Sequence, residues 1–113
     1  MISIDEMRVL VDEIREEIPE DAFKYLIGLN IIDESKYKPN LGYVLGEYKR
    51  DMIMGRHILL YYGSIITLYG YKDIDDLRYE IKKVIIHELT HHVESLLGVN
   101  DLELQDDKYI NNQ

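Results

Sequence analysis

Apolar residues recur every three or four positions from residue 74 to residue 97, which is the spacing that gives an α-helix one apolar face. Asp73 is suited to cap the N-terminus of this helix, and Gly98 is a natural stop at its C-terminus. We therefore predict one long helix between these two residues. The apolar residues expected to share its buried side are Ile74, Ile81, Ile85, Leu89, Val93 and Leu96.

Shorter apolar patterns organise the rest of the chain. Residues 3–17 have helical spacing, and Pro19 ends that helix. The segments expected to form strands are residues 29–32, 42–48 and 57–62. The remaining segments are a short helix at 20–27, a loop at 35–40 and a short helix at 65–69. These elements predict an α+β fold, with a small mixed sheet packed on the long helix, in one domain that spans residues 1–113.

The predicted long helix contains HELTH at residues 87–91, a complete HExxH sequence. From the His and Glu content, roughly 0.01 such matches are expected by chance in this chain. Residues four apart lie on one helix face, so His87 and His91 can offer two imidazoles to one metal ion, while Glu88 can act as a general base. Glu88 is expected at the border of the metal-facing sector. The residues expected within that sector are Glu80, His87, His91 and Glu94.

A catalytic zinc ion needs a third protein ligand, and the acidic segment after the helix is the natural source. If Gly98 reverses the chain, an extended return brings Asp101 and Glu103 level with the histidines. We expect Asp101 to be the ligand, with Glu103 second. Glu94 lies one turn beyond His91, where a carboxylate that orients a ligand histidine is expected more often than a direct ligand. His92 and His57 are expected to have no direct role in metal binding.

The stretch HELTHHVESLLGVNDLEL, together with LGEYKRD and GRHILLYYG, resembles the small bacterial zincin-like metallopeptidases called mini-zincins, of the Asp-zincin type HExxHxxGxxD. The resemblance implies a minimal zincin-like fold, Zn²⁺ held by His87, His91 and Asp101, and Glu88 as general base or acid. One departure matters, because seven positions rather than three lead from His91 to Gly98. This apparent extra helical turn keeps Glu103 and Glu94 open as ligands.

Composition limits the other function classes. The 113 residues are 46% hydrophobic and include no cysteine, so the chain can bury one core, and any zinc must use nitrogen and oxygen ligands. The net charge of −9 disfavours binding to nucleic acid or to an anionic membrane. We see no signal peptide or membrane span and expect a cytoplasmic protein. Its oligomeric state stays open, with a dimer through the first helix as one alternative.

The sequence therefore predicts a zinc-dependent metallopeptidase that acts on a peptide or protein substrate. Zinc would lower the pKa of a water molecule, Glu88 would take its proton, and the same residue would return a proton to the leaving amine. The segment 57–62 is expected to be the edge strand along which substrate lies. Tyr109 is one candidate for stabilising the oxyanion. The alternatives are a zincin-fold scaffold without turnover, and a structural zinc site closed by Glu94 and Asp101.

Overall fold

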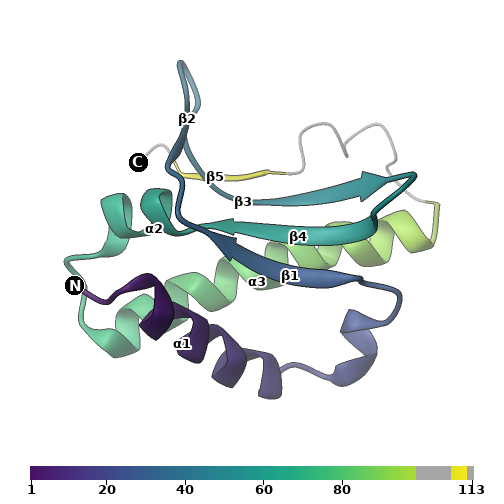
Figure 1. Ribbon diagram of the computed structural model, residues 1–113, viewed down its shortest axis with the longest axis horizontal. Helices are drawn as coiled ribbons and strands as arrows, with labels where there is room; N and C mark the ends of the chain where they lie inside the picture. Colours follow the sequence, from purple (N-terminus) through teal and green to yellow (C-terminus); the bar gives the residue numbers. More distant parts are fainter. Residues whose placement is uncertain (99–107, 112–113) are drawn as a thin grey trace.

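The computed structural model describes residues 1–98 and 108–111 and contains two layers, a curled sheet and the helices packed on one of its faces (Figure 1). The helical elements are α1 (Ile4–Glu16), the 3-10 helix η1 (Glu20–Phe23), α2 (Tyr62–Tyr69) and α3 (Ile74–Leu96). The strands are β1 (Gly28–Ile32), β2 (Lys36–Lys38), β3 (Gly42–Asp51), β4 (Gly55–Tyr61) and β5 (Lys108–Asn111). The predicted α+β fold, a mixed sheet on one long helix, is confirmed.

The strand order is β1-β4-β3-β2, and β5 pairs with β3. β4 runs parallel to β1 and antiparallel to β3, so it lies inside the sheet. The expectation that segment 57–62 forms an edge strand is therefore wrong, because both of its sides are already hydrogen-bonded. β2 also forms where a loop was expected, since residues 36–38 turn back through Asn40 and pair with the start of β3.

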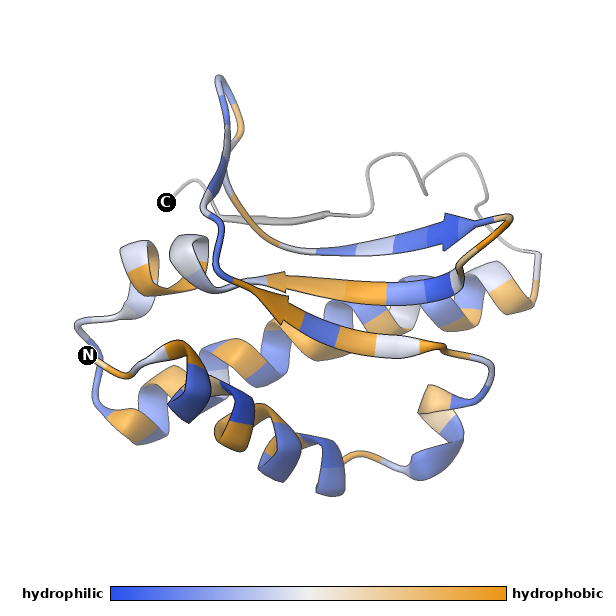
Figure 2. Cartoon of the chain, in the orientation of Figure 1, coloured by the Kyte–Doolittle hydropathy of each residue, from blue (hydrophilic) through white to orange (hydrophobic). Residues whose placement is uncertain are grey.

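The helix α1 packs beside α3 under the sheet. Ser3 and Glu6 form a capping box, in which the Ser3 hydroxyl accepts from the Glu6 N–H and the Glu6 carboxylate accepts from the Ser3 N–H. The apolar side of α1 turns toward α3 and the sheet, and its charged side faces outward (Figure 2). Arg78 of α3 pairs with Glu13 and Glu17 of α1, which fixes α1 along one flank of α3.

The long helix α3 begins and ends as the sequence predicts. The Asp73 side chain accepts from the backbone N–H of Asp76, and Gly98 follows the helix with a φ of 72°. Its buried side differs from the prediction, because Ile74, Val93 and Leu96 are 51%, 42% and 40% exposed. The residues of α3 that are buried are Leu77, Ile81, Val84, Ile85, Glu88, Leu89, His92 and Ser95.

The sheet approaches α3 most closely at Gly46 of β3. A Cβ atom there would lie 2.9 Å from Val84 Cγ1 and 3.2 Å from the carbonyl oxygen of Leu59. A side chain at this position would push β3 away from the helix, so glycine is what allows the strand to lie directly over α3. Across residues 1–98 and 108–111, no helix combines the length and the apolar content that a membrane span needs.

Candidate metal centre on the long helix

His87 and His91 lie side by side on one flank of α3. Their ring centroids are 4.8 Å apart and the rings are nearly perpendicular. His91 Nδ1 is 3.5 Å from a carboxylate oxygen of Glu94, which is the orienting arrangement expected for that residue and directs Nε2 away from it. Burial, and then the nearby His91, lower the pKa of His87. A lowered pKa favours the neutral imidazole, which is the form that binds metal ions.

Glu88 lies on the core side of α3 and not at the border of a metal-facing sector. Its side chain is fully buried, although glutamate is among the residues most often exposed to solvent. The sequence-based assignment of helix faces placed Val93 and Leu96 in the core and Glu88 at the border of the metal-facing sector, and it was wrong for all three residues. In the folded chain the sheet covers the sector between Val84 and His92, and Glu88 falls in the middle of it.

His92 is also fully buried, contrary to the expectation that it is a bystander. Its Nε2 lies 2.7 Å from the backbone carbonyl oxygen of Lys24, so this nitrogen must carry the proton and donate it. Nδ1 then accepts from the hydroxyl of Tyr48, at 2.9 Å. Burial lowers the pKa of His92 and keeps the ring neutral. This chain of hydrogen bonds fixes α3 against both β3 and the segment after η1.

Tyr48 and two further polar residues beside α3 were not found from the sequence. Arg56 donates to Ser95 Oγ at 2.7 Å, and Arg50 approaches the same hydroxyl at 3.3 Å. Tyr48 and Arg50 are two positions apart along β3, so both side chains lie on the face of the sheet toward α3. Only the register of β3 and β4 over α3 could reveal these contacts, because each joins residues about 40 positions apart in the chain.

The histidines and α1 lie on opposite flanks of α3. Arg78 and Lys82 point toward α1, where they pair with Glu17. His87 follows Arg78 by nine positions and His91 follows Lys82 by nine, and at about 100° per residue nine positions are half a turn. The histidine pair is therefore on the flank away from α1. Figure 1 shows that β1 lies on the α1 side of the sheet and β3 on the other side.

The described residues do not form a metal site by themselves. Among them, no group of three or more His, Asp or Glu side chains could hold a metal ion. Asp101 and Glu103, the two carboxylates expected to supply a third ligand, lie outside the described residues, and so does the side chain of Tyr109. The donors that are described fit zinc, since two imidazoles four residues apart with an adjacent carboxylate are the ligand and base types of zinc hydrolases.

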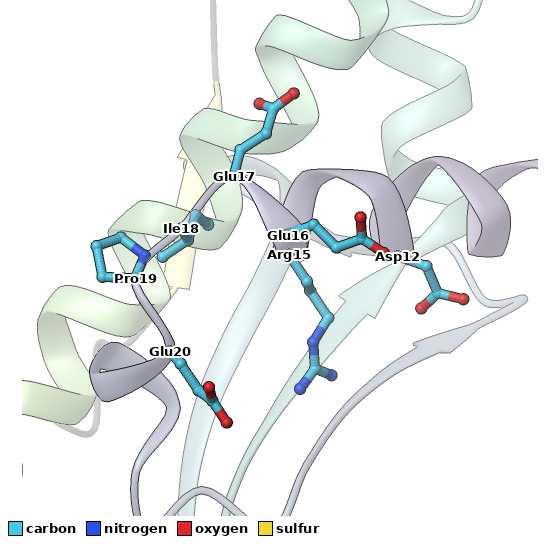
Figure 3. Close-up of a pocket in the computed structure, with 7 residues that line it drawn as sticks. All are labelled: Asp12, Arg15, Glu16, Glu17, Ile18, Pro19 and Glu20. Carbon is cyan, nitrogen blue, oxygen red and sulfur yellow. The ribbon is translucent and has the colours of Figure 1, made fainter.

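Two surface hollows lie near the end of α1, and one of them reaches Glu94 beside His91. One, of about 850 Å³, lies at the end of α1 and is lined mainly by carboxylates (Figure 3). Of these, Glu17 already pairs with Arg78 and Lys82. The other, of about 320 Å³, is apolar and follows the α1 flank of α3. Its lining residues are Ile18, Ala22, Ile86, Leu89, Thr90, Val93 and Glu94.

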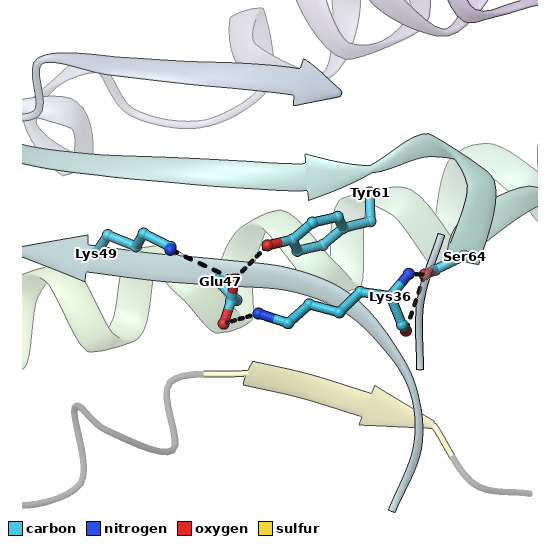
Figure 4. A network of polar contacts seen from close by, with 5 residues as sticks. All are labelled: Lys36, Glu47, Lys49, Tyr61 and Ser64. Carbon is cyan, nitrogen blue, oxygen red and sulfur yellow. Dashed lines mark hydrogen bonds and ion pairs between the residues drawn. The ribbon is translucent and has the colours of Figure 1, made fainter. Parts of the chain in front are cut away.

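A polar network lies on the outer face of the sheet (Figure 4). Glu47 accepts hydrogen bonds from Tyr61 and from Lys36, and Lys49 is also near its carboxylate. Burial opposes ionisation of Glu47, but these donors outweigh it and lower the pKa of the carboxyl group. Burial and the same pairing raise the pKa of Tyr61. Because Glu47 lies between Gly46 and Tyr48, which face α3, this network points away from the histidines.

An HExxH sequence on a helix beneath a mixed sheet defines the class of zincin metallopeptidases. A family model described as zincin-like metallopeptidase matches residues 39–109, which is more than half of the chain. The chain therefore belongs to the zincin-like metallopeptidase family. The resemblance stated from HELTH and its flanking segments is confirmed.

Comparison with solved structures finds a protein with a similar fold. A conserved hypothetical protein from Thermus thermophilus is 34% identical to this chain, with a TM-score of 0.70. The similarity covers 85% of this chain and 98% of that one. A search among curated proteins found no match.

Proposed function

We propose that this protein is a zinc-dependent peptidase that hydrolyses peptide bonds in a peptide or protein substrate. The observation that carries the proposal is the His87–His91 pair, with ring centroids 4.8 Å apart on the flank of α3 opposite α1, next in sequence to the buried Glu88. Membership of the zincin-like metallopeptidase family supports the same reaction class.

His87 and His91 would hold the metal ion through their imidazole nitrogens. Asp101 remains our preferred third ligand, with Glu103 as the alternative, because both follow the turn at Gly98. Zinc supplies Lewis acidity there, which polarises a carbonyl group and makes water acidic enough to lose a proton near neutral pH. Glu94, 3.5 Å from His91 Nδ1, holds that ring so that its other nitrogen is available to the metal.

Glu88 acts as the proton carrier. Its carboxylate takes the proton from the attacking water and returns a proton to the nitrogen of the leaving amine, so that one residue serves both halves of the reaction. The hydrogen bonds of His92, one helical turn beyond Glu88, to Tyr48 and to Lys24 hold α3 beneath the sheet. A base carried on a rigid helix is positioned more precisely than one on a loop.

A zincin-fold scaffold without turnover is the second candidate. The complete burial of Glu88 favours it, since a carboxylate enclosed by the core can serve packing without reaching a substrate. A structural zinc site closed by Glu94 and Asp101 would likewise need no base. The two candidates differ in what the Glu88 side chain is required to do.

The test measures bound zinc by elemental analysis and cleavage of a casein-derived peptide mixture by mass spectrometry. For a peptidase, the wild type binds one zinc ion and cleaves, and Glu88→Gln retains zinc but loses cleavage by at least about 100-fold. Asp101→Ala loses zinc affinity, whereas Glu103→Ala keeps it. Zinc binding without cleavage by the wild type would favour the scaffold. Loss of zinc from Glu103→Ala alone would exchange the assignments of the two carboxylates.

A further inference from the structure

The two edges of the sheet differ in what pairs with them. β1 forms one edge and pairs with β4 alone among the described strands. β3 pairs with β4 and β2 along one side, and β5 pairs in the antiparallel direction with its other side, which we call the β3 edge. The pairs are Tyr43 with Asn111, Val44 with Ile110, Gly46 with Tyr109, and Glu47 with Lys108. Figure 1 shows β5 beside β3. β5 also contacts α3, so this short strand borders both the β3 edge and the helix that carries HELTH.

The β3 edge is the one that lies near the histidine pair. Gly46 packs over Val84, and Tyr48 bonds to His92, so β3 passes directly above the part of α3 that contains HELTH. His87 and His91 project from the flank of α3 opposite α1, on the β3 side. A peptide bound along the β1 edge would lie on the far side of the sheet from them. An extended peptide that brings a backbone carbonyl to the histidines must therefore use the β3 edge.

A strand edge offers one row of N–H and C=O groups and can pair with one added strand at a time. Peptides commonly bind to proteins by adding a strand to such an edge. We propose that residues 108–111 occupy, within the same chain, the strand position that a peptide needs beside His87 and His91, so that β5 and substrate compete for the β3 edge. The inference rests on the proposed peptidase function and adds how its substrate would bind and be excluded.

The attachment of β5 to α3 favours it over a free peptide. A strand held by a short connection has an effective concentration in the millimolar range. β5 therefore excludes a free peptide at micromolar concentration from the β3 edge unless the peptide makes further contacts. The advantage is limited, since β5 has only four residues and the net contribution of each backbone hydrogen bond is small. Competition of this kind raises KM and leaves kcat unchanged, whereas a purely structural strand would affect folding stability.

The test uses the full chain and a fluorescein-labelled peptide with the sequence DDKYINNQ, which repeats residues 106–113. In one variant, Tyr109→Pro and Ile110→Pro are combined. Successive backbone N–H groups point to opposite sides of a strand. One of the N–H groups of residues 109 and 110 must therefore point toward β3, and the proline substitution removes it. The matched control combines Tyr109→Ala and Ile110→Ala and keeps every backbone donor. The Kd of the labelled peptide, measured by fluorescence anisotropy, should fall on the order of tenfold in the proline variant relative to wild type, and much less in the control.

A second variant keeps all residues of β5 in case the proline variant does not fold. Thirty Gly and Ser residues inserted between Asp107 and Lys108 lengthen the connection and leave Asp101 and Glu103 in place. The effective concentration of β5 should fall by roughly sevenfold, since it decreases as about the −3/2 power of the length. The Kd of the peptide, and KM for any peptide that is cleaved, should fall by a similar factor without a change in kcat.

Unchanged peptide affinity in both folded variants would overturn the inference, whether or not the protein cleaves peptides. Tighter peptide binding with a lower KM would support both the inference and the proposed function. Tighter peptide binding without cleavage by any variant would support the competition at the β3 edge and would contradict the proposed function. A lower kcat with unchanged peptide affinity would assign β5 a structural role and would also overturn the inference.

Discussion

Removal of the Tyr48 hydroxyl tests how the sheet is held over the candidate metal centre. Tyr48 is buried, and its O–H donates to Nδ1 of the fully buried His92 at 2.9 Å. The ring cannot adopt the other tautomer, because its Nε2 must donate to the Lys24 carbonyl at 2.7 Å. Tyr48→Phe therefore leaves a buried nitrogen acceptor without this donor, while the packing of the aromatic ring is preserved.

The expected cost follows from the burial of this acceptor. A buried polar atom that loses its partner costs about 1–3 kcal/mol of folding free energy. For a domain of this size, each 1 kcal/mol lowers Tm by about 4–6 °C, so Tyr48→Phe should lower Tm by about 4–18 °C. Urea unfolding followed by far-UV circular dichroism, with EDTA present so that bound metal adds no stability, should show a lower midpoint and an unchanged m-value.

Two further measurements separate this hydrogen bond from general effects of the substitution. Tyr37→Phe removes a hydroxyl from a tyrosine that is 59% exposed, and it should change stability by less than about 0.5 kcal/mol. In a double-mutant cycle of Tyr48→Phe with His92→Leu, the coupling energy should be about 1 kcal/mol or more. A cost for Tyr48→Phe below about 0.5 kcal/mol, or additive effects in the cycle, would refute the reasoning.

Three other predictions concern the fold around the site. Gly46→Ala should lower the free energy of unfolding by about 1–3 kcal/mol through the 2.9 Å contact with Val84 Cγ1, and adding Val84→Ala should restore part of this loss. If the changes in urea midpoint of the two substitutions simply add in the double variant, the contact is not the cause. The pKa of Glu47 is lowered in the folded state, so its stabilisation is present above the ordinary carboxyl pKa and is lost as pH falls through the lowered value. Glu47→Gln should therefore cost about 1–3 kcal/mol at pH 7 and much less in acid, and an equal difference from wild type at both pH values would count against the pairing. Gly98→Ala should cost about 1–2 kcal/mol through its φ of 72° alone, since a Cβ there meets no atom within 4 Å, and thermal unfolding of the variant measures this.

The long helix and its motif were predictable because they depend on local sequence. The positions of Asp73 and Gly98 at its ends follow from the capping preferences of those residues. The proximity of His87 and His91 follows from the geometry of any α-helix, and the ring separation of 4.8 Å agrees with it. Three strands of the sheet could likewise be located from short apolar runs, but β2 and β5, which have three and four residues, were not predicted.

The buried side of the helix was less predictable, because hydropathy treats every polar residue as exposed. Glu88 and His92 are fully buried, whereas Val93 and Leu96 are largely exposed. His92 can be buried because Tyr48 and Lys24, 44 and 68 positions away, satisfy its two ring nitrogens. A window of neighbouring residues contains no information about such partners.

The sequence by itself determined that two histidines and a glutamate share one helix, and this suffices to indicate a zinc hydrolase. Only the tertiary structure decided which flank of that helix faces the sheet edge, and which strand forms that edge. β4 was expected there, but β1 and β3 pair with its two sides. The side of β3 away from β4 lies there instead, and β5 pairs with it. The physical reason is that a strand's place in a sheet depends on pairing with distant segments, whereas helix geometry depends on residues within a few positions of one another.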